Sequence, residues 1–411
     1  MSIKRRIFQA LALGLLAGYG SFGMTQAVAA DSRWIGPAIN GFALDLYARL
    51  AANPGNLFFS PSNIETALAM TYAGARGRTA DQMAMVLRLP PTGDSVHGDM
   101  GAFISRLNGS ADTGTARAYQ LSVANALWGQ TGAPFLPSFT GLLQRDYGAG
   151  LRQVDYRGNS EGARKTINDW VASQTHDKIN DLIPPGVFNA DTVLTLVSAI
   201  YFNGTWADKF DKRATRDAPF HISATQQVTA HLMNRSGQYG YAETDDCQVL
   251  KLDYAGDALS MIVLLPRAID GLPRVEKGLT AEKLDGLCSG LIERKVNVSL
   301  PKFRLLWSHQ LSDTLSAMGM PDAFDARADF SGMDGKRDLA ISAVIHKAFV
   351  DVNEQGTEAA AATAVVMARA LMIKTEPPPV FRADHPFLFL IRDEASGAIL
   401  FMGRLASPDA A

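Results

Sequence analysis

A run of small residues near the C-terminus restricts the folds that this chain can adopt. Residues 356–371 read GTEAAAATAVVMARAL, and neither proline nor lysine occurs after Gly356 until Lys374, where KTEPPP follows. The alanines have high helix propensity, so an ordinary buried helix is one interpretation. Residues 343–356, AVIHKAFVDVNEQG, form a long strand pattern that leads directly into the run. The run is therefore either a helix or an extended segment that continues a strand.

The composition predicts a large folded core. Of 411 residues, 47% are hydrophobic and 19% are charged, which excludes a disordered chain. The formal net charge of −2 provides no electrostatic footprint for nucleic acid or for an anionic membrane, so neither is expected as a partner.

The N-terminus has the pattern of a secretory signal peptide. MSIKRR is basic, IFQALALGLLAG is a short apolar core, and QAVAADS offers cleavage after Ala29 or Ala30. The apolar core is too short to span a bilayer comfortably, which argues against the alternative of an uncleaved anchor. No cysteine lies near the cleavage point, so the sequence does not indicate a lipid anchor. We expect residues 1–30 to be removed and the mature chain to be secreted or periplasmic, without a membrane segment.

The chain contains two cysteines, Cys247 and Cys288. An oxidising compartment would permit one disulfide between them. The sequence does not establish whether the two thiols meet, because that depends on the distance between their backbones.

Helical patterns precede strand patterns along the chain. INGFALDLYARLAA places Ile39, Phe42, Ala43, Leu46 and Leu50 on one helical face. Residues 63–89 predict two helices broken at residues 74–77, with Thr79 as the cap of the second, and residues 163–183 predict another helix. The predicted strands are 193–202, 259–266, 296–303 and a hairpin formed by 386–393 and 398–405. The order indicates an α+β fold in one domain, residues 31–411.

Motifs for conventional catalysis are absent from the sequence. It has no G-x-S-x-G, H-E-x-x-H, P-loop or Cys-x-x-Cys pattern, and its seven histidines show no metal-ligand spacing. A nucleophile and base brought together from distant positions would leave no such motif, so an unrecognised hydrolase is one alternative. We expect a protein that is not an enzyme and that needs neither a cofactor nor a metal.

Five segments, in order along the chain, resemble the serpin family. They are NLFFSPSNIETALAMTYAGARGRTADQM, LTLVSAIYFNGTWADKF, VNVSLPKF, VIHKAFVDVNEQGTEAAAATAVV and DHPFLFLIRDEASGAILFMGRL. Together with the signal peptide, the resemblance suggests an exported bacterial serpin. It implies three β-sheets, about nine helices and an exposed reactive-centre loop, here about residues 354–379.

The resemblance also implies a function. Inhibitory serpins form covalent 1:1 complexes with serine proteases, and sometimes cysteine proteases, as suicide inhibitors, and we expect this chain to act as a monomer. The runner-up is a noninhibitory serpin that acts as a carrier or chaperone-like binding protein.

An inhibitory loop must be exposed first and become a strand of the central sheet after cleavage. Small alternate side chains suit insertion between existing strands, because they avoid overpacking. No proline interrupts the run, and Pro377 to Pro379 keep the distal part extended. The expected hinge residues are Glu354, Gly356, Thr357, Glu358, Ala359, Ala360, Ala361, Ala362 and Thr363. The inward set is Thr357, Ala359, Ala361, Thr363, Val365 and Met367, and Glu358 belongs to the outward set.

Two further groups match family motifs. Ser60, Asn63, Asn203 and His346 match the shutter, a buried polar cluster beneath the strands that part. The sequence departs from the family at Asn63, where serine is usual. Trp206, Lys302 and Glu354 match the breach, where insertion begins, and an ion pair between Lys302 and Glu354 is expected.

The family places the reactive bond about 17 residues beyond the glutamate at the base of the loop. This spacing predicts cleavage at Ala370–Leu371, which suits the small apolar pocket of an elastase-type or subtilisin-type protease. A slip of one residue gives Arg369–Ala370 instead, which needs the acidic pocket of a trypsin-type protease. Leu371 or Met372 would suit a chymotrypsin-like pocket.

Overall fold

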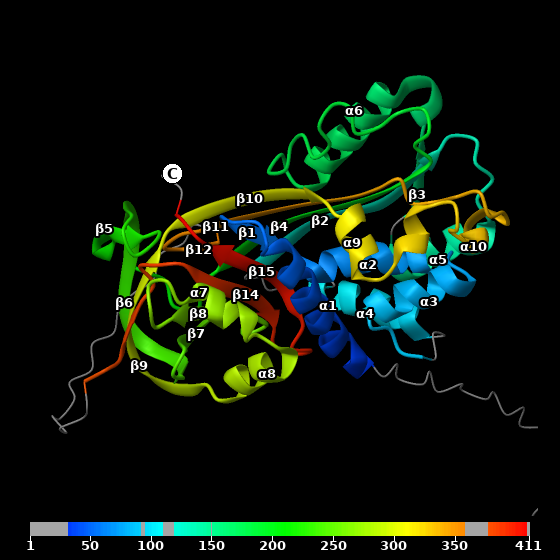
Figure 1. Ribbon diagram of the computed structural model, residues 1–411. Helices are drawn as coiled ribbons and strands as arrows, with labels where there is room; N and C mark the ends of the chain where they lie inside the picture. Colours follow the sequence, from blue (N-terminus) through cyan, green and yellow to red (C-terminus); the bar gives the residue numbers. More distant parts are fainter. Residues whose placement is uncertain (1–31, 92–94, 110–118, 149, 358–376, 409–411) are drawn as a thin grey trace, which may run out of the picture. The chain divides into compact units, whose positions relative to one another are not determined.

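Helices form much of the first part of the chain, as their apolar spacing predicts. The computed structural model describes residues 32–91, 95–109, 119–148, 150–357 and 377–408 (Figure 1). The side chains expected on one face of the first helix are all buried. The α-helices of the described residues are α1 (Ile35–Leu50), α2 (Pro61–Tyr72), α3 (Gly77–Val86), α4 (Val96–Asn108), α5 (Pro137–Tyr147), α6 (Tyr156–Gln174), α7 (Leu272–Lys277), α8 (Ala281–Ser289), α9 (Ser312–Met318) and α10 (Ser331–Asp334).

Two of the helix predictions are wrong in detail. The second helix of the predicted pair begins at Gly77, so Thr79 lies inside α3, where its hydroxyl oxygen accepts a hydrogen bond from the backbone amide of Asp329 instead of capping the helix. The helix expected over residues 163–183 begins earlier and ends at Gln174. After it, His176 adopts a positive φ that stops the helix, although the apolar spacing continues.

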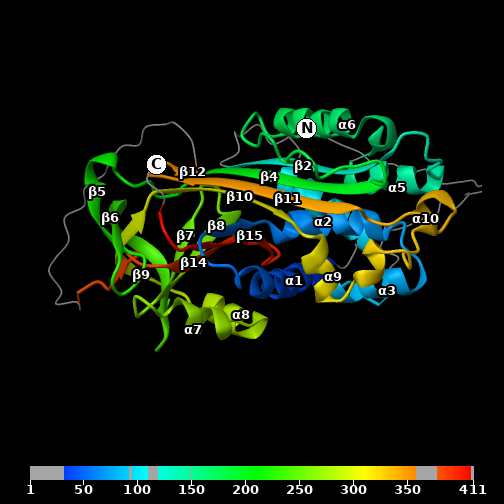
Figure 2. The same ribbon diagram turned by 45° about the horizontal axis from the view of Figure 1, so that its top comes forward.

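Six strands form the sheet that carries the expected site. Its order is β10-β11-β4-β2-β3, and β12 pairs with the end of β4. Strands β11 and β4 are parallel neighbours, and Figure 2 shows them side by side, with α6 over one face and α2 beneath the other. The strands are β2 (Tyr119–Gln130), β3 (Leu151–Val154), β4 (Leu194–Thr205), β10 (Phe303–Gln310), β11 (Ala343–Val352) and β12 (Gly356–Thr357).

The remaining strands form one hydrogen-bonded sheet of nine strands. Strand β6 pairs with both β7 and β9, so the two smaller sheets expected from the family join into one continuous set. The predicted C-terminal hairpin is present as β14 and β15. The strands are β1 (Leu57–Phe59), β5 (Arg216–His221), β6 (Gln227–Glu243), β7 (Cys247–Asp253), β8 (Leu259–Pro266), β9 (Ile292–Pro301), β13 (Val380–Arg382), β14 (Phe387–Asp393) and β15 (Ile399–Leu405).

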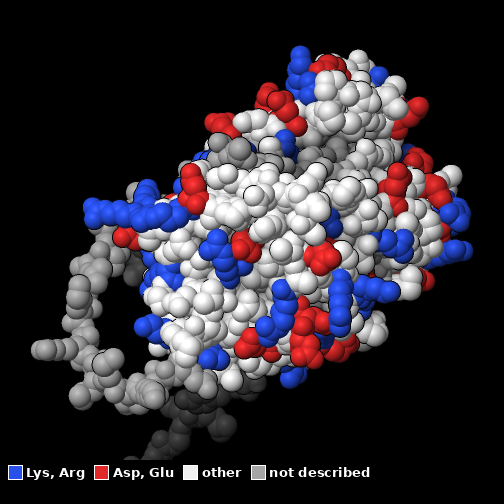
Figure 3. All heavy atoms as spheres, turned by 60° about the vertical axis from the view of Figure 1, so that its left-hand side comes forward, with Lys and Arg blue, Asp and Glu red and all other residues white. Residues whose placement is uncertain are grey.

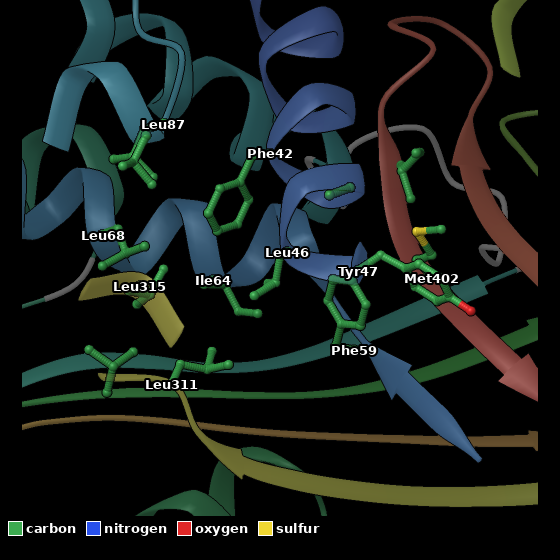
Figure 4. Close-up of a cluster of buried hydrophobic side chains, with 14 of the residues drawn as sticks. Phe42, Leu46, Tyr47, Phe59, Ile64, Leu68, Leu87, Leu311, Leu315 and Met402 are labelled. Carbon is green, nitrogen blue, oxygen red and sulfur yellow. The ribbon is translucent and has the colours of Figure 1, made fainter. Parts of the chain in front are cut away.

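The core explains why β4 is apolar on both faces. Its even-numbered residues, such as Leu196, pack with the helical side of the molecule, and its odd-numbered residues, such as Val197 and Ala199, pack with α6. Figure 4 shows the helical side, where Phe42, Leu46, Ile64, Leu68 and Leu315 meet. A sheet covered on both faces needs such a continuous apolar strand.

Residues Asp31–Ala411 form one compact unit. The α+β fold that we expected is observed, and the predicted signal peptide, residues 1–30, lies outside the described residues. No helix within the described ranges is both long enough and apolar enough to cross a membrane.

Candidate functional site: the seam between two parallel strands

The candidate site is the seam between β4 and β11. The two strands pair in parallel from Thr195 opposite Ala343 to Tyr201 opposite Phe349. Parallel pairing is slightly weaker per residue than antiparallel pairing, so this boundary is a favourable place for the sheet to part. Beyond Phe349, β11 no longer pairs with β4, and β12 pairs with the end of β4 instead.

A tight turn follows β11 and returns the chain to β4. Asn353 and Gly356 form a bridge, and β12 then pairs antiparallel with β4, Gly356 opposite Thr205 and Thr357 opposite Gly204. Gly356 has a φ of +132°, and a Cβ added there would lie 2.2 Å from the carbonyl oxygen of Gly204. Glycine is therefore required by the backbone conformation and by the close approach of β4.

Glu354 lies in this turn and is held by several donors. Lys302 Nζ lies 3.1 Å from its Oε2 atom, which confirms the expected ion pair, and the Thr215 hydroxyl donates to its Oε1 atom at 2.8 Å. The carboxylate is only 4% exposed, whereas the Lys302 side chain is 38% exposed. Burial acts to raise the pKa of Glu354, but hydrogen bonds from its own backbone amide, Thr215 and Lys302 outweigh burial and keep the pKa below its usual value.

Trp206 follows the end of β4 and contacts the turn that precedes β12. Its indole N–H donates to the carbonyl oxygen of Asn353 at 3.0 Å, and its ring stacks on Tyr254 with the ring centroids 4.5 Å apart. Its backbone amide also donates to the carbonyl of Gln355. Trp206, Lys302 and Glu354 thus lie together around the turn that precedes β12.

A buried polar cluster lies beneath the middle of the seam. His346 on β11 and Ser198 on β4 are register partners, with His346 Nδ1 3.0 Å from Ser198 Oγ. Asn63 on α2 donates from Nδ2 to the same oxygen at 2.9 Å, and the backbone amide of Ser60 donates to His346 Nε2 at 3.1 Å. The side chain of Ser60 donates to the carbonyl oxygen of Leu400 on β15. The cluster therefore connects both strands of the seam to the helix beneath them.

The hydrogen bonds determine the tautomer of His346. Because Nε2 accepts from a backbone amide, the proton of the neutral ring lies on Nδ1, which donates to Ser198. Complete burial lowers the pKa of His346 to about 3, so the ring is neutral at physiological pH. A protonated ring would place an N–H against the amide of Ser60.

Asn203 does not join this cluster, so its assignment from the family motif was wrong. It pairs with Gln120 of β2 and lies five positions beyond Ser198, an odd number, on the opposite face of β4. Ser198 supplies the group that Asn203 was expected to supply. Sequence reasoning also missed Asn125, whose Nδ2 atom donates to Asn63 Oδ1 at 2.7 Å. The odd separation of five residues along a strand was the signal that could have placed Asn203 and Ser198 on opposite faces.

Residues 358–376 of the expected loop lie outside the described residues. This applies to Glu358, Ala359, Ala360, Ala361, Ala362 and Thr363 of the hinge, and to Arg369, Ala370 and Leu371 of the reactive bond.

The two cysteines lie outside the seam, on β7 and α8. Cys247 and Cys288 are free thiols, the first buried and the second partly buried. Within the described residues, no cluster of three or more histidine, cysteine, aspartate or glutamate side chains could hold a metal. Figure 3 shows basic and acidic side chains interspersed on the face that carries β5 and β6.

The comparisons with known proteins agree with this geometry. A family model described as Serpin (serine protease inhibitor) matches residues 37–408. The human leukocyte elastase inhibitor is 44% identical over 378 residues, covering 89% of this chain and 97% of that protein. An uncharacterised serpin-like protein from Thermococcus kodakarensis is 40% identical over 371 residues, covering 90% of this chain and 85% of its own.

Solved structures show the same fold. Uncleaved ovalbumin has a TM-score of 0.82 at 31% identity and covers 91% of this chain and 100% of its own. Human thyroxine-binding globulin, solved with its ligand, also has a TM-score of 0.82, at 28% identity, covering 92% of this chain and 99% of its own. The family match across nearly the whole chain, joined to the seam geometry, shows that this chain is a member of the serpin family.

Proposed function

We propose that this serpin is a suicide inhibitor of serine proteases that traps the acyl-enzyme by inserting its cleaved loop between β4 and β11. The observation that carries the proposal is β12, because the hinge already pairs with the end of β4 in the antiparallel direction that insertion requires. Strand addition of this kind is how serpins in general modify their central sheet.

The register between β12 and β4 can be continued along β4. Gly356 pairs with Thr205 and Thr357 with Gly204, so a one-for-one continuation places residue 363 opposite Ser198 and residue 367 opposite Leu194, where β4 begins. Residues 357, 359, 361, 363, 365 and 367 would then share the face of the even-numbered β4 residues. In this register the inserted segment would be as long as β4, and the small inward residues expected from the sequence would lie on the core-facing side of the sheet.

The energy of insertion is large enough to drive trapping. Parting β4 from β11 and placing a strand between them replaces one ladder by two, a gain of about a dozen backbone hydrogen bonds at roughly 1 kcal/mol each. Burial of the inward side chains adds to this at about 25 cal/mol per Å². Insertion of about a dozen residues also moves a tethered protease by roughly 40 Å, since each residue of a strand advances about 3.3 Å.

We place the reactive bond at Ala370–Leu371. The protease serine would attack the carbonyl carbon of Ala370, and the amine of Leu371 would leave, so the acyl group remains on the inserting strand. Relatives named leukocyte elastase inhibitor support a protease with a small apolar pocket. Cleavage at Arg369–Ala370 is the alternative and names a trypsin-type protease.

The test is incubation of the mature protein with pancreatic elastase, trypsin and chymotrypsin, followed by denaturing electrophoresis. We expect a covalent 1:1 complex with elastase and a released peptide whose first residue is Leu371 by mass spectrometry. A peptide that begins at Ala370 would support the arginine alternative. Cleavage without a complex for every protease would support a noninhibitory role, such as ligand binding of the kind seen in human thyroxine-binding globulin.

A matched pair of hinge variants tests insertion itself. Thr357→Arg places a charge opposite Gly204 on the face that would enter the core, and a buried unpaired charge resists insertion. We expect this variant to be cleaved as a substrate with little complex formed. Glu358→Arg, on the alternate face, should keep most of the inhibition. Equal inhibition by the two variants would contradict the register.

We further propose that the protein is exported as a monomer after removal of residues 1–30. N-terminal sequencing of the protein from the expressing cells, with size-exclusion chromatography, tests both points. A retained Met1 or a stable oligomer would contradict them.

A further inference from the structure

The two ends of the expected reactive-centre loop are held by one short stretch of β9 and the residue after it. At the departing end, Lys302, which directly follows β9, pairs with Glu354 at 3.1 Å. At the returning end, the backbone amide of Asn297 donates to the carbonyl oxygen of Pro379 at 2.9 Å. Asn297 and Lys302 are five residues apart in sequence, which in an extended chain is roughly 17 Å. The two ends of the loop are therefore anchored close together.

A group of cations lies beside the middle of this stretch. Asn234 of β6 is the register partner of Ser299 of β9. Its Nδ2 atom donates at 2.9 Å to the carbonyl oxygen of Ala214, which ends the short 3-10 helix η4 (Lys212–Ala214). Three basic side chains of η4 and the start of β5 are exposed, and we call them the η4 basic patch: Lys212, Arg213 and Arg216.

The carboxylates near the η4 basic patch have other partners. Figure 3 shows acidic and basic side chains interspersed on this face, but Asp208 pairs with Arg235 at 2.8 Å and Asp217 lies 2.6 Å from His231 Nδ1. Asp211 caps η4, because its Oδ1 atom accepts a hydrogen bond from a backbone amide of that helix at 2.9 Å. Among the residues that the structure describes, none forms an ion pair with the three cations of the patch. Their charge is therefore available to a partner.

The length of the loop limits where a bound protease can lie. Residues 358–376 connect the two ends. Seven residues separate Ala370 from Pro377, so a protease at the bond Ala370–Leu371 stays within about 25 Å of Pro377. A protease domain of about 200 residues is roughly 40 Å across. A body of that size, held at that reach, covers the surface between the two ends of the loop, where the η4 basic patch lies.

We propose that the η4 basic patch contacts the target protease beside its active site and favours proteases that are acidic there. The inference rests on the proposed inhibitory function and adds a determinant of specificity that is separate from the reactive bond. Exposed charge pairs contribute little to affinity, but complementary charge raises the rate of encounter about tenfold or more. The patch would therefore act mainly on association, and salt would screen its effect.

Anionic and cationic trypsin test the proposal, because they cleave after the same residues and carry opposite net charge. The loop contains Arg369 and Lys374, so the rate at which trypsin consumes the intact chain is measurable whether or not a trapped complex forms. Failure of trapping and failure of the patch are thus observed separately. Lys212→Ser combined with Arg213→Ser should slow consumption by anionic trypsin about fivefold at about 0.02 M salt, and less than about twofold at about 0.5 M. Consumption by cationic trypsin should not slow.

A second double variant is the matched control. Arg157→Ser combined with Lys165→Ser removes the same charges from the exposed surface of α6 and should leave both rates unchanged. Arg216 is kept in both variants, because its guanidinium donates to the carbonyl oxygens of Arg213 and Thr215. Melting curves check that each variant is folded. Equal slowing by the two double variants, or equal slowing with the two trypsins, would overturn the proposal. So would an unchanged rate with anionic trypsin, even if the patch bound heparin.

Discussion

The Nδ1 atom of His346 lies 3.0 Å from the Oγ atom of Ser198, across the boundary between β11 and β4. The same oxygen accepts a hydrogen bond from Asn63 on α2. One hydroxyl group thus joins two strands and a helix at the place where a strand would be inserted. This contact makes the stability of the closed sheet depend on a few buried polar atoms.

Removal of that hydroxyl should loosen the seam. Ser198→Ala would leave the His346 and Asn63 donors unpaired in a dry environment, which costs about 1–3 kcal/mol. We expect a lower midpoint of unfolding in guanidinium chloride. We also expect loop-inserted or polymeric species to form faster on mild heating, as measured by native electrophoresis. Ser122→Ala is the matched control, because Ser122 is buried on β2 with an unpartnered hydroxyl. Equal losses in the two variants would contradict a special role for Ser198.

Asn63 and Ser198 should behave as a coupled pair. Asn63→Ser removes the amide that reaches both Ser198 and Asn125, and Ser198→Asn crowds the existing amide. In the double variant the amide extends from the strand toward the helix, so the contact is restored from the other side. We expect the double variant to be more stable than the sum of the single losses predicts, with a coupling of about 0.5–3 kcal/mol. Strict additivity in denaturant unfolding would show that the two side chains act independently.

Acid should destabilise the closed sheet through His346. Its folded pKa of about 3 is lower than the unfolded value of 6.5, so the unfolded chain binds more protons between these values and stability falls as pH drops below 6.5. His97 and His309 have lowered pKa values as well and act in the same direction. Denaturation at pH 7.5, 6.5 and 5.5 should show this loss, and His346→Gln should reduce the slope without abolishing it. An unchanged slope in the variant would exclude His346 as a contributor.

Glu65 of α2 should be a site where substitution stabilises the protein. Its side chain is fully buried, neither carboxyl oxygen has a partner, and burial raises its pKa well above the usual value. Because the folded group holds its proton where the unfolded group has lost it, this residue costs increasing stability as pH rises above about 4.5. Glu65→Met should therefore gain about 1–3 kcal/mol at neutral pH.

The pH dependence separates this effect from simple packing. The gain of Glu65→Met over the natural chain should shrink as the pH approaches 4.5, and Glu65→Gln should gain less because it still buries a polar amide. Unfolding transitions at pH 4.5 and 7.5 measure the difference. A gain that is the same at both pH values would mean that the carboxyl group is not its cause.

The sequence by itself determined the local features of this protein. Apolar spacing located α1, β4, β8 and the C-terminal hairpin, because each depends on neighbours within a few residues of the chain. The resemblance to serpins located the turn at Glu354 and its ion pair with Lys302, since both residues stand in recognisable motifs. The helix interpretation of the run after Gly356 could not be decided from propensity, which describes only local preference.

Tertiary structure decided which polar residues meet. Asn203 and Ser198 lie on one strand, but only Ser198 shares the face of α2, and only the parallel register of β4 with β11 places it opposite His346. Likewise Thr79 bonds Asp329 rather than capping its own helix. Asn125 joins Asn63 although 62 positions separate them in the chain. Such contacts depend on how distant elements pack, and a pattern confined to neighbouring residues does not contain that information.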